Sequence, residues 1–542
     1  MAIANEQGRL GQPEPDAAYD YIIVGAGSAG CVLAARLSED PQVSVCLIEA
    51  GPSDAIDSIS VPVAGGTLCR SEYDWDYDTH DEPQLGGRRL YLPRGRVLGG
   101  TSSINGMVHI RGNALDYDDW RQPGWSYSEL LPYFKRCEDN ERGASYYNGA
   151  GGPLAVSENR SRNPMSTAFV RAAVQAGLPA NDDFNGRRQD GFGYYQVTQR
   201  NGRRCGTAAG YLNPVLDRPN LTVYPHLRVH RVLVRDGRAS GVQCQRLDQL
   251  LSLRANREVI LSAGAYNSPQ LLMLSGIGPA DQLSRLGIAV QLDQPEVGRN
   301  LQDHPSCYLV FSHSQPISLL SAAEPEYVRQ FEEEGRGPLT SNIPEAGGFV
   351  RTRSDLPAPD VQFHSLPVMF LEGALGASVE HGISFGPCVL KPDSRGEVVL
   401  ATGQPTAKPR IRHNYYSAES DLSTMVAGLR VGMEIARQEA LIPFTEKRFR
   451  FPDSGSEADL RAFARANTQS VYHPVGTCAM GTVLDAELRV NGVAGLRVVD
   501  ASVMPSVPRG NTNAPTVAIA EKAADLIRGR RPAPLDQAVP VA

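Results

Sequence analysis

Among the ten histidines of the chain, His473 has the context that best suits catalysis. It lies in the segment YHPVGTCAMG, where Pro474 restricts the backbone of the preceding residue toward extended geometry and so keeps His473 on a turn. An imidazole has an ordinary pKa of about 6.5 and can accept a proton at neutral pH. We therefore expect His473 to act as a general base.

A second chemical pattern is the glycine-rich turn in DYIIVGAGSAGCVLAARL, which follows an apolar run and opens a helical pattern. Gly25 permits the tight turn, Gly27 lets the backbone approach a pyrophosphate, and Gly30 lets the helix pack closely on the sheet. Glu49 ends the next apolar run, VSVCLIEAG, where a carboxylate can accept hydrogen bonds from a ribose diol. The pattern predicts a dinucleotide site, without deciding between FAD and NAD.

These residues need a sheet to position them. Strand–helix or strand–loop units of one nucleotide-binding layer are expected at residues 21–49, 259–278 and 496–527. Further segments have strand-like or helical periodicity, namely strands at 221–234, 361–366 and 397–400 and a helix at 423–438. A nucleotide domain assembled from distant segments, with a second domain inserted between them, explains this order.

Composition narrows the class of protein. The chain has 542 residues, 41% of them hydrophobic, with 53 Lys and Arg against 60 Asp and Glu, a formal net charge of −7. The sequence has no stripe of Lys and Arg interleaved with aromatic residues, which is the pattern that would indicate nucleic-acid binding. The nine cysteines are scattered, without CxxC or zinc-like spacing, which favours a reducing compartment and no metal site.

Neither a signal-peptide core nor a run of about 18 apolar residues is found. We expect a cytoplasmic protein. Peripheral contact with the inner membrane face and the oligomeric state stay open.

The segments PRGRVLGGTSSINGMVHIRG, from Pro93, and GAYNSPQLLMLSGIG, from Gly264, resemble the two signature stretches of the glucose–methanol–choline (GMC) oxidoreductases, which are FAD-dependent enzymes. EVGRNLQDHP, YHPVGTCAMG, VVDASVMP and GNTNAPTVAIAEKAADLI also resemble family blocks in the expected order. The resemblance extends from about Asp20 to Arg528. DGFGYYQVTQRNGRR, LTSNIPEAGGFVRT and VQFHSLP carry a finer likeness to bacterial primary-alcohol and choline dehydrogenases.

The resemblance implies an α/β fold, α+β overall, with a Rossmann-like FAD-binding domain and an inserted substrate domain built on an antiparallel sheet and helices. We assign residues 16–165, 210–305 and 465–535 to the first domain, and 166–209 and 306–464 to the second.

FAD is the cofactor that the resemblance implies. Ile104 stands where some relatives carry a histidine bonded to the flavin, so we expect non-covalent binding. The residues expected to hold FAD are Gly25, Gly27, Ser28, Gly30, Glu49, Trp75, Val97, Gly100, Thr101, Asn105, Met107, Val108, Val229, Ala263, Asp500, Ala501 and Thr516.

By the same resemblance His473 lies over the flavin and takes the proton of an alcohol while hydride leaves for flavin N5. Asn513 would donate a hydrogen bond to the alcohol oxygen. We prefer it to Asn511 because the NAPT sequence, aligned with the family block, brings Asn513 to the catalytic position. Specificity is expected from apolar residues of the inserted domain, with Glu345 near the pocket; the apolar residues are Phe363, Leu366, Val368, Met369 and Phe370.

The function predicted is FAD-dependent oxidation of an aliphatic or benzylic primary alcohol to the aldehyde, with quinone or oxygen as electron acceptor. Choline dehydrogenases and oxygen-using aryl-alcohol or hydroxymethylfurfural oxidases are alternatives within the family. Other classes are a non-redox FAD enzyme (a lyase or photodecarboxylase), a zinc or iron alcohol dehydrogenase, and a non-enzymatic nucleotide-binding protein. Clustered metal ligands are missing from the sequence, and the last class leaves the His473 block unexplained.

Overall fold

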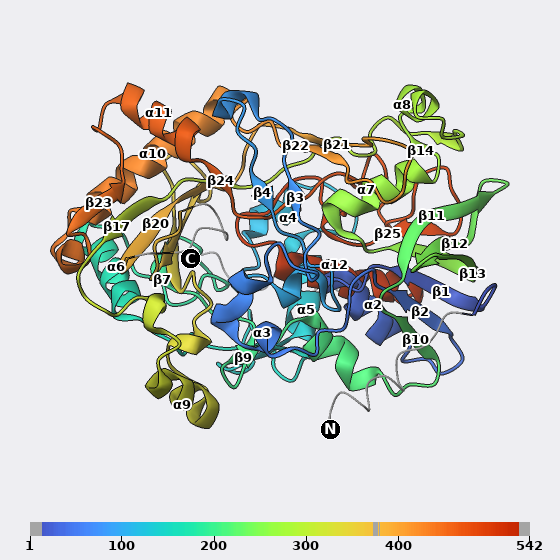
Figure 1. The fold of residues 1–542 in the computed structure, drawn as a ribbon, viewed down its shortest axis with the longest axis horizontal. Helices are drawn as coiled ribbons and strands as arrows, with labels where there is room; N and C mark the ends of the chain where they lie inside the picture. Colours follow the sequence, from blue (N-terminus) through green and yellow to red (C-terminus); the bar gives the residue numbers. More distant parts are fainter. Residues whose placement is uncertain (1–13, 372–377, 379, 531–542) are drawn as a thin grey trace.

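Two sheets, one largely parallel and one antiparallel, organise the chain in the computed structural model, which describes residues 14–371, 378 and 380–530. In Figure 1 the parallel sheet lies on the right and the antiparallel sheet on the left, with the long helix α12 (Asn513–Ile527) between them in the view.

The first sheet has the strand order β10-β2-β1-β13-β12-β11, with β25 beside β13. Its parallel pairs join segments far apart in the chain, because β1 pairs with both β2 and β13, and β13 also pairs with β25. The strands are β1 (Ala18–Val24), β2 (Val45–Ile48), β10 (Leu221–Tyr224), β11 (Arg228–Arg235), β12 (Arg238–Arg246), β13 (Gln249–Leu261) and β25 (Leu496–Val498).

Helices cover this layer. All four residues of β2 are buried, as expected for a parallel strand covered on both faces. Helix α2 (Ser28–Leu37) follows β1, and α7 (Gly264–Leu274) follows β13. Helix α12 is buried from Ala514 to Asp525 and is tied to α2 by the ion pair of Arg36 with Glu521, at 2.9 Å.

The second sheet has the order β23-β17-β20-β19-β18-β7, and all its pairs are antiparallel. In addition β16 pairs with β20, and β24 pairs with β16. Helices α6 (Pro164–Gln175) and α10 (Glu419–Ala436) lie on this sheet, and α11 (Glu457–Asn467) packs against α10 (Figure 1). Its strands are β7 (Gly191–Tyr194), β16 (Pro305–Ser306), β17 (Leu309–Ser312), β18 (Ala346–Val350), β19 (Val361–Leu366), β20 (Gly382–Val389), β23 (Lys447–Arg450) and β24 (Gln469–Ser470).

Short elements connect the two layers. The helices are α3 (Asp57–Ser60), α4 (Ala114–Asp118), α5 (Tyr127–Cys137), α8 (Ala280–Arg285) and α9 (Pro325–Glu334). The short strands are β3 (Tyr77–Asp78), β4 (Tyr91–Leu92), β5 (Glu138–Asn140), β6 (Leu154–Val156), β8 (Gln199–Arg200), β9 (Arg203–Arg204), β14 (Ile277–Gly278), β15 (Leu292–Asp293), β21 (Glu397–Val399) and β22 (Arg410–Arg412).

The predicted combination of a Rossmann-like layer with an antiparallel second sheet is confirmed. The strand expected at 361–366 coincides with β19, whereas the run 221–234 is divided into β10 and β11. The domain boundaries drawn from the sequence stay a prediction, and residues 531–535 lie outside the described residues. None of the described helices is long and apolar enough to cross a bilayer.

Candidate active site

Glycine stands at the three positions of the first turn for different physical reasons. Gly25 has a φ of 99°, a left-handed conformation that favours glycine. A Cβ on Gly30 would lie 1.9 Å from the carbonyl oxygen of Gly25, so the start of α2 packs too closely for any side chain. A Cβ on Gly27 would meet nothing nearer than the Ser262 carbonyl oxygen at 3.8 Å. The fold does not require glycine at position 27, which instead leaves open the wall of a cavity.

A second glycine-rich loop lies directly against the first. Gly100 has a φ of 52°, and a Cβ there would lie 2.6 Å from the Cα of Gly27. A Cβ on Gly95 would lie 2.2 Å from the carbonyl oxygen of Gly100. The two loops therefore approach backbone to backbone, and both line the cavity.

Glu49 directly follows β2, next to these loops. Its carboxylate accepts hydrogen bonds from the backbone N–H groups of Ala26, at 3.0 Å, and Gly51, at 2.9 Å. Burial raises the pKa of Glu49 to about 7, although the two amides oppose the increase. The predicted ribose acceptor thus lies at the cavity wall, held by backbone donors.

One continuous cavity runs from the glycine loops to His473. Two predicted cofactor residues do not line it: Gly30 packs against Gly25, and Val97 is buried against Ile59 and Leu68. The other predicted cofactor residues all line it, namely Gly25, Gly27, Ser28, Glu49, Trp75, Gly100, Thr101, Asn105, Met107, Val108, Val229, Ala263, Asp500, Ala501 and Thr516.

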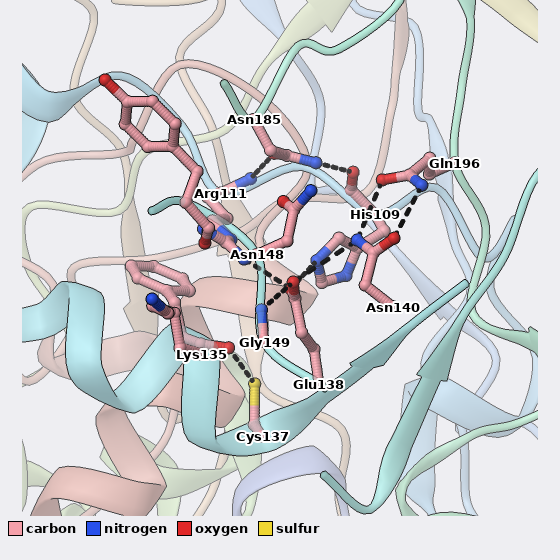
Figure 2. A network of polar contacts seen from close by, with 12 residues as sticks. His109, Arg111, Lys135, Cys137, Glu138, Asn140, Asn148, Gly149, Asn185 and Gln196 are labelled. Carbon is pink, nitrogen blue, oxygen red and sulfur yellow. Dashed lines mark hydrogen bonds and ion pairs between the residues drawn. The ribbon is translucent and has the colours of Figure 1, made fainter. Parts of the chain in front are cut away.

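A buried ionic network fixes the strand-like segment that carries Met107 and Val108. Figure 2 shows Glu138 accepting from His109 Nε2 at 3.1 Å and from Arg111 at 2.5 Å, while its other oxygen accepts from the Gly149 N–H. Burial alone would raise the pKa of Glu138, but Arg111 and His109 outweigh it and hold the pKa at about 2. The segment behind the cavity wall is therefore anchored by a permanently charged carboxylate.

Hydrogen-bond directions fix the tautomer of His473. His304 Nε2 lies 3.0 Å from the carbonyl oxygen of Leu390, which can only accept, so Nε2 carries the proton of a neutral His304. The Nδ1 of His304 must then accept from His473 Nδ1, 2.9 Å away. Burial lowers the pKa of His304 to about 4 and the pKa of His473 well below its usual value. His473 is therefore neutral at pH 7, with its lone pair on Nε2.

A second chain of hydrogen bonds ends on that lone pair. Tyr195 donates to the Phe363 carbonyl oxygen at 2.5 Å and so accepts from the Gln362 amide at 3.1 Å. The same amide nitrogen of Gln362 donates to Asn511 Oδ1 at 3.2 Å. Asn511 must then direct its NH₂ group at His473 Nε2, 3.1 Å away. Each of the two hydrogen-bond chains starts at a backbone carbonyl oxygen. Both place the proton of the His473 ring on Nδ1 and its lone pair on Nε2.

The structure thus brings Asn511 against His473, while Asn513 has a different contact. Asn513 is the first residue of α12, and its Oδ1 accepts a hydrogen bond from Ser28 at 2.7 Å. Both asparagines line the cavity. The sequence prediction chose Asn513, whereas the observed partner of Nε2 is Asn511.

The backbone of His473 is held as firmly as its ring. Its N–H donates to Asp303 at 2.7 Å, and the same carboxylate accepts from Tyr415 and Ser470 at 2.5 Å. Tyr472 adopts a φ of 68°. The predicted turn before Pro474 is therefore fixed by a buried carboxylate.

Beyond His473 the cavity is enclosed mainly by apolar side chains. Leu366, Val368, Met369 and Phe370 line it, as predicted, but Phe363 belongs to the core of the second sheet. Other described residues at this end are Tyr308, Ile343, Pro344 and His364.

Glu345 does not line the cavity, which corrects its predicted place near the pocket. It is fully buried, and its carboxylate accepts from the Asn163 N–H at 2.9 Å, Ser166 at 2.8 Å and Ser341 at 2.7 Å. These bonds join the start of α6 to the segment directly before β18. The described residues at this end of the cavity therefore include no carboxylate.

Comparison with known proteins decides the family. A family model described as GMC oxidoreductase matches residues 19–306, and its C-terminal counterpart matches residues 392–520. The chain belongs to the GMC oxidoreductases. It is therefore an FAD-dependent oxidoreductase of the class that acts on CH–OH groups.

Individual GMC relatives match almost the whole chain. Mitochondrial choline dehydrogenase of Homo sapiens is 45% identical over 552 residues, covering 96% of this chain and 92% of that protein. Alcohol dehydrogenase (acceptor) of Pseudomonas putida is 43% identical, covering 94% and 95% respectively. The crystal structure of pyridoxine 4-oxidase from Mesorbium loti has a TM-score of 0.86 at 30% identity, covering 94% of this chain and 99% of that one.

Sequence reasoning missed the groups that orient the two catalytic candidates. His304 lies in the family block EVGRNLQDHP, where a histidine beside an acid was a usable signal. Gln362 and Tyr195 lie in segments used only for the finer likeness, and nothing in their spacing indicated a contact with Asn511. In the described ranges no group of three or more His, Cys, Asp or Glu side chains has a geometry suited to a metal.

The glycine geometry makes a prediction that separates folding from cofactor binding. Gly30→Ala should destabilise the protein by about 1–3 kcal/mol or more, because the methyl group overlaps a backbone carbonyl. Gly27→Ala should keep the melting temperature of the cofactor-free protein but weaken FAD binding roughly tenfold or more, a cost of about 1.4 kcal/mol. Thermal unfolding and FAD titration measure the two effects. Unchanged FAD affinity in Gly27→Ala would contradict the assigned role of Gly27.

Proposed function

We propose that this GMC oxidoreductase oxidises apolar primary alcohols, aliphatic or benzylic, to aldehydes. The observation that carries the proposal is the neutral His473, whose Nε2 lone pair lies 3.1 Å from the Asn511 amide at the cavity wall. Bound FAD supplies the hydride acceptor.

His473 takes the hydroxyl proton. Its Nδ1–H is committed to His304, so Nε2 is the atom that receives the proton. The low pKa of the buried ring keeps it deprotonated at neutral pH. Asp303 holds the backbone of His473 and His304 holds its ring, which limits the reorganisation that the proton transfer requires.

Asn511 donates a hydrogen bond to the alcohol oxygen. An alcohol hydroxyl that reaches His473 Nε2 also reaches the NH₂ group that now donates to that nitrogen. The amide can then turn its hydrogen bond toward the oxygen as negative charge develops there. Gln362 keeps the amide in this orientation by donating to its oxygen. Asn513, with its oxygen bonded to Ser28, is the weaker candidate for this role.

The substrate class follows from the cavity beyond His473. Leu366, Val368 and Met369 offer a hydrocarbon tail a dry surface. Glu345 is occupied by three donors elsewhere and cannot serve as counter-ion to a cationic substrate.

Choline is the second candidate, because Tyr308 and Phe370 form an edge-to-face pair, with centroids 5.3 Å apart, at the same end of the cavity. An aromatic pair can contact a quaternary ammonium group. The names of two relatives, from human mitochondria and from Burkholderia ambifaria, support this reading.

Kinetic variants test the assigned roles. His473→Ala should slow anaerobic flavin reduction by about 10²- to 10⁴-fold with FAD still bound. Asn511→Ala should slow it by about 10-fold or more through lost stabilisation of the oxygen, and Asn513→Ala should have the smaller effect. Stopped-flow reduction by a saturating alcohol gives the rates. Wild-type rates in His473→Ala would refute the base, and a larger loss in Asn513→Ala than in Asn511→Ala would return the oxygen role to Asn513.

A substrate series tests the apolar pocket. Each added CH₂ should raise kcat/KM by about fourfold until the pocket is full, since burial of one CH₂ contributes about 0.8 kcal/mol. The series from ethanol to octanol, with benzyl alcohol and choline measured alongside, is the experiment. Choline giving a higher kcat/KM than hexanol and benzyl alcohol would replace the proposal by the second candidate.

For the electron acceptor we propose a quinone in preference to oxygen, by likeness to the alcohol dehydrogenase (acceptor) of Pseudomonas putida. Alcohol-reduced enzyme should be reoxidised faster by a soluble quinone than in air-saturated buffer. Flavin absorbance and peroxide formation record the two reactions. Peroxide formation that matches the quinone rate would identify an oxidase instead.

A further inference from the structure

Arg204 is a buried cation that lies behind the residues lining the cofactor cavity. It ends the short strand β9, and only 6% of the residue is exposed. Its guanidinium donates to three backbone carbonyls: Ile59 at 3.0 Å, Ser102 at 3.3 Å and Asn105 at 2.6 Å. It thereby joins α3 to the glycine-rich loop that lines the cavity.

No carboxylate among the described residues pairs with Arg204. Other arginines in buried networks differ, because Arg111 pairs with Glu138 and Arg36 with Glu521. Burial lowers the pKa of Arg204 to about 9, which still leaves it protonated at neutral pH. The molecule therefore keeps one positive charge in a low-dielectric region without a local counter-ion.

That charge lies immediately behind the cavity wall. The Nη2 atom of Arg204 has no hydrogen-bond partner. A Cβ built on Gly65, which lines the cavity, would lie 3.2 Å from this atom. Glycine at position 65 lets the wall close tightly over the guanidinium.

Arg204 also decides which way the Asn105 amide faces. Asn105 Oδ1 lies 3.0 Å from Arg204 Nη1 and 3.0 Å from the Met107 N–H. Both neighbours can only donate, so the atom between them must be the oxygen. The NH₂ group is turned away from them, and Asn105 lines the cavity.

We propose that Arg204 is a positioning and electrostatic residue for bound FAD: it turns the Asn105 amide so that a donor faces the cofactor, and its unpaired charge favours the reduced flavin. Two-electron reduction adds negative charge to the ring system, and a nearby buried cation stabilises that charge more strongly than it would in water. The inference rests on FAD as cofactor and is independent of the alcohol.

The test is the midpoint potential of bound FAD, measured anaerobically by equilibration with a reference dye. Arg204→Met removes the charge and the donors, Arg204→Gln keeps a donor without the charge, and Arg204→Lys keeps the charge. We expect Met and Gln to lower the equilibrium constant for flavin reduction at least tenfold, about 30 mV for a two-electron couple, and Lys to stay near wild type.

Arg203→Met is the matched control, because Arg203 precedes Arg204 in β9 but stacks on Phe331 at the protein surface, 4.5 Å from the ring centroid. Its potential should equal that of the wild type. Wild-type potentials in Arg204→Met and Arg204→Gln, or an equal drop in Arg204→Lys, would overturn the proposal.

A further variant keeps the test decisive if the Arg204 variants do not fold. Asn105→Asp places a carboxylate against the guanidinium, which neutralises the charge and removes the NH₂ donor in a side chain of the same shape. The potential should again fall. An unchanged potential in folded, FAD-bound Asn105→Asp would contradict both parts of the inference.

Discussion

The backbone-to-backbone contact between two glycine-rich loops is the constraint on which the site depends. Gly100 leaves room only for the Cα of Gly27, and Gly30 leaves room only for the carbonyl of Gly25. A side chain at Gly30 would push α2 off the sheet, and a side chain at Gly100 would push the second loop away from the first. Because the loops meet this closely, one wall of the cavity is backbone, and His473 and Asn511 reach the cavity from the segment after β24 and from the segment before α12.

Around His473 the direction of each hydrogen bond follows from groups that can only accept or can only donate. Carbonyl oxygens of Leu390 and Phe363 can only accept, and from these two ends the protons of His304, His473 and Asn511 follow without ambiguity. The same reasoning sets Asn105 from the donor-only guanidinium of Arg204. The neutral state of His473, the proposed base, and the orientation of the Asn511 amide thus depend on residues behind them.

The sequence predicted the features that depend on residues close together in the chain. The tight turn at Gly25 and the close packing at Gly30 are present in the structure. Gly27 and Glu49 line the cavity, and their contacts with the cofactor stay a prediction. The turn at His473 followed from Pro474. It missed what depends on long-range packing. Two asparagines only two residues apart could not be told apart without knowing that Gln362 reaches one of them. Glu345 was misplaced because its three donors come from segments whose proximity exists only in the folded chain.

The order of the segments along the chain has a consequence for biosynthesis. β25 adds to a sheet whose other strands come much earlier, and α12 completes the burial of α2 while bringing Asn511 and Thr516 to the cavity. β25 and α12 are the last of these elements to be synthesised. Until they are released, α2 lacks its covering helix and the Arg36 charge lacks Glu521. The part of the cavity wall that comes from α12 and from the segment before it is therefore in place only after translation has passed α12.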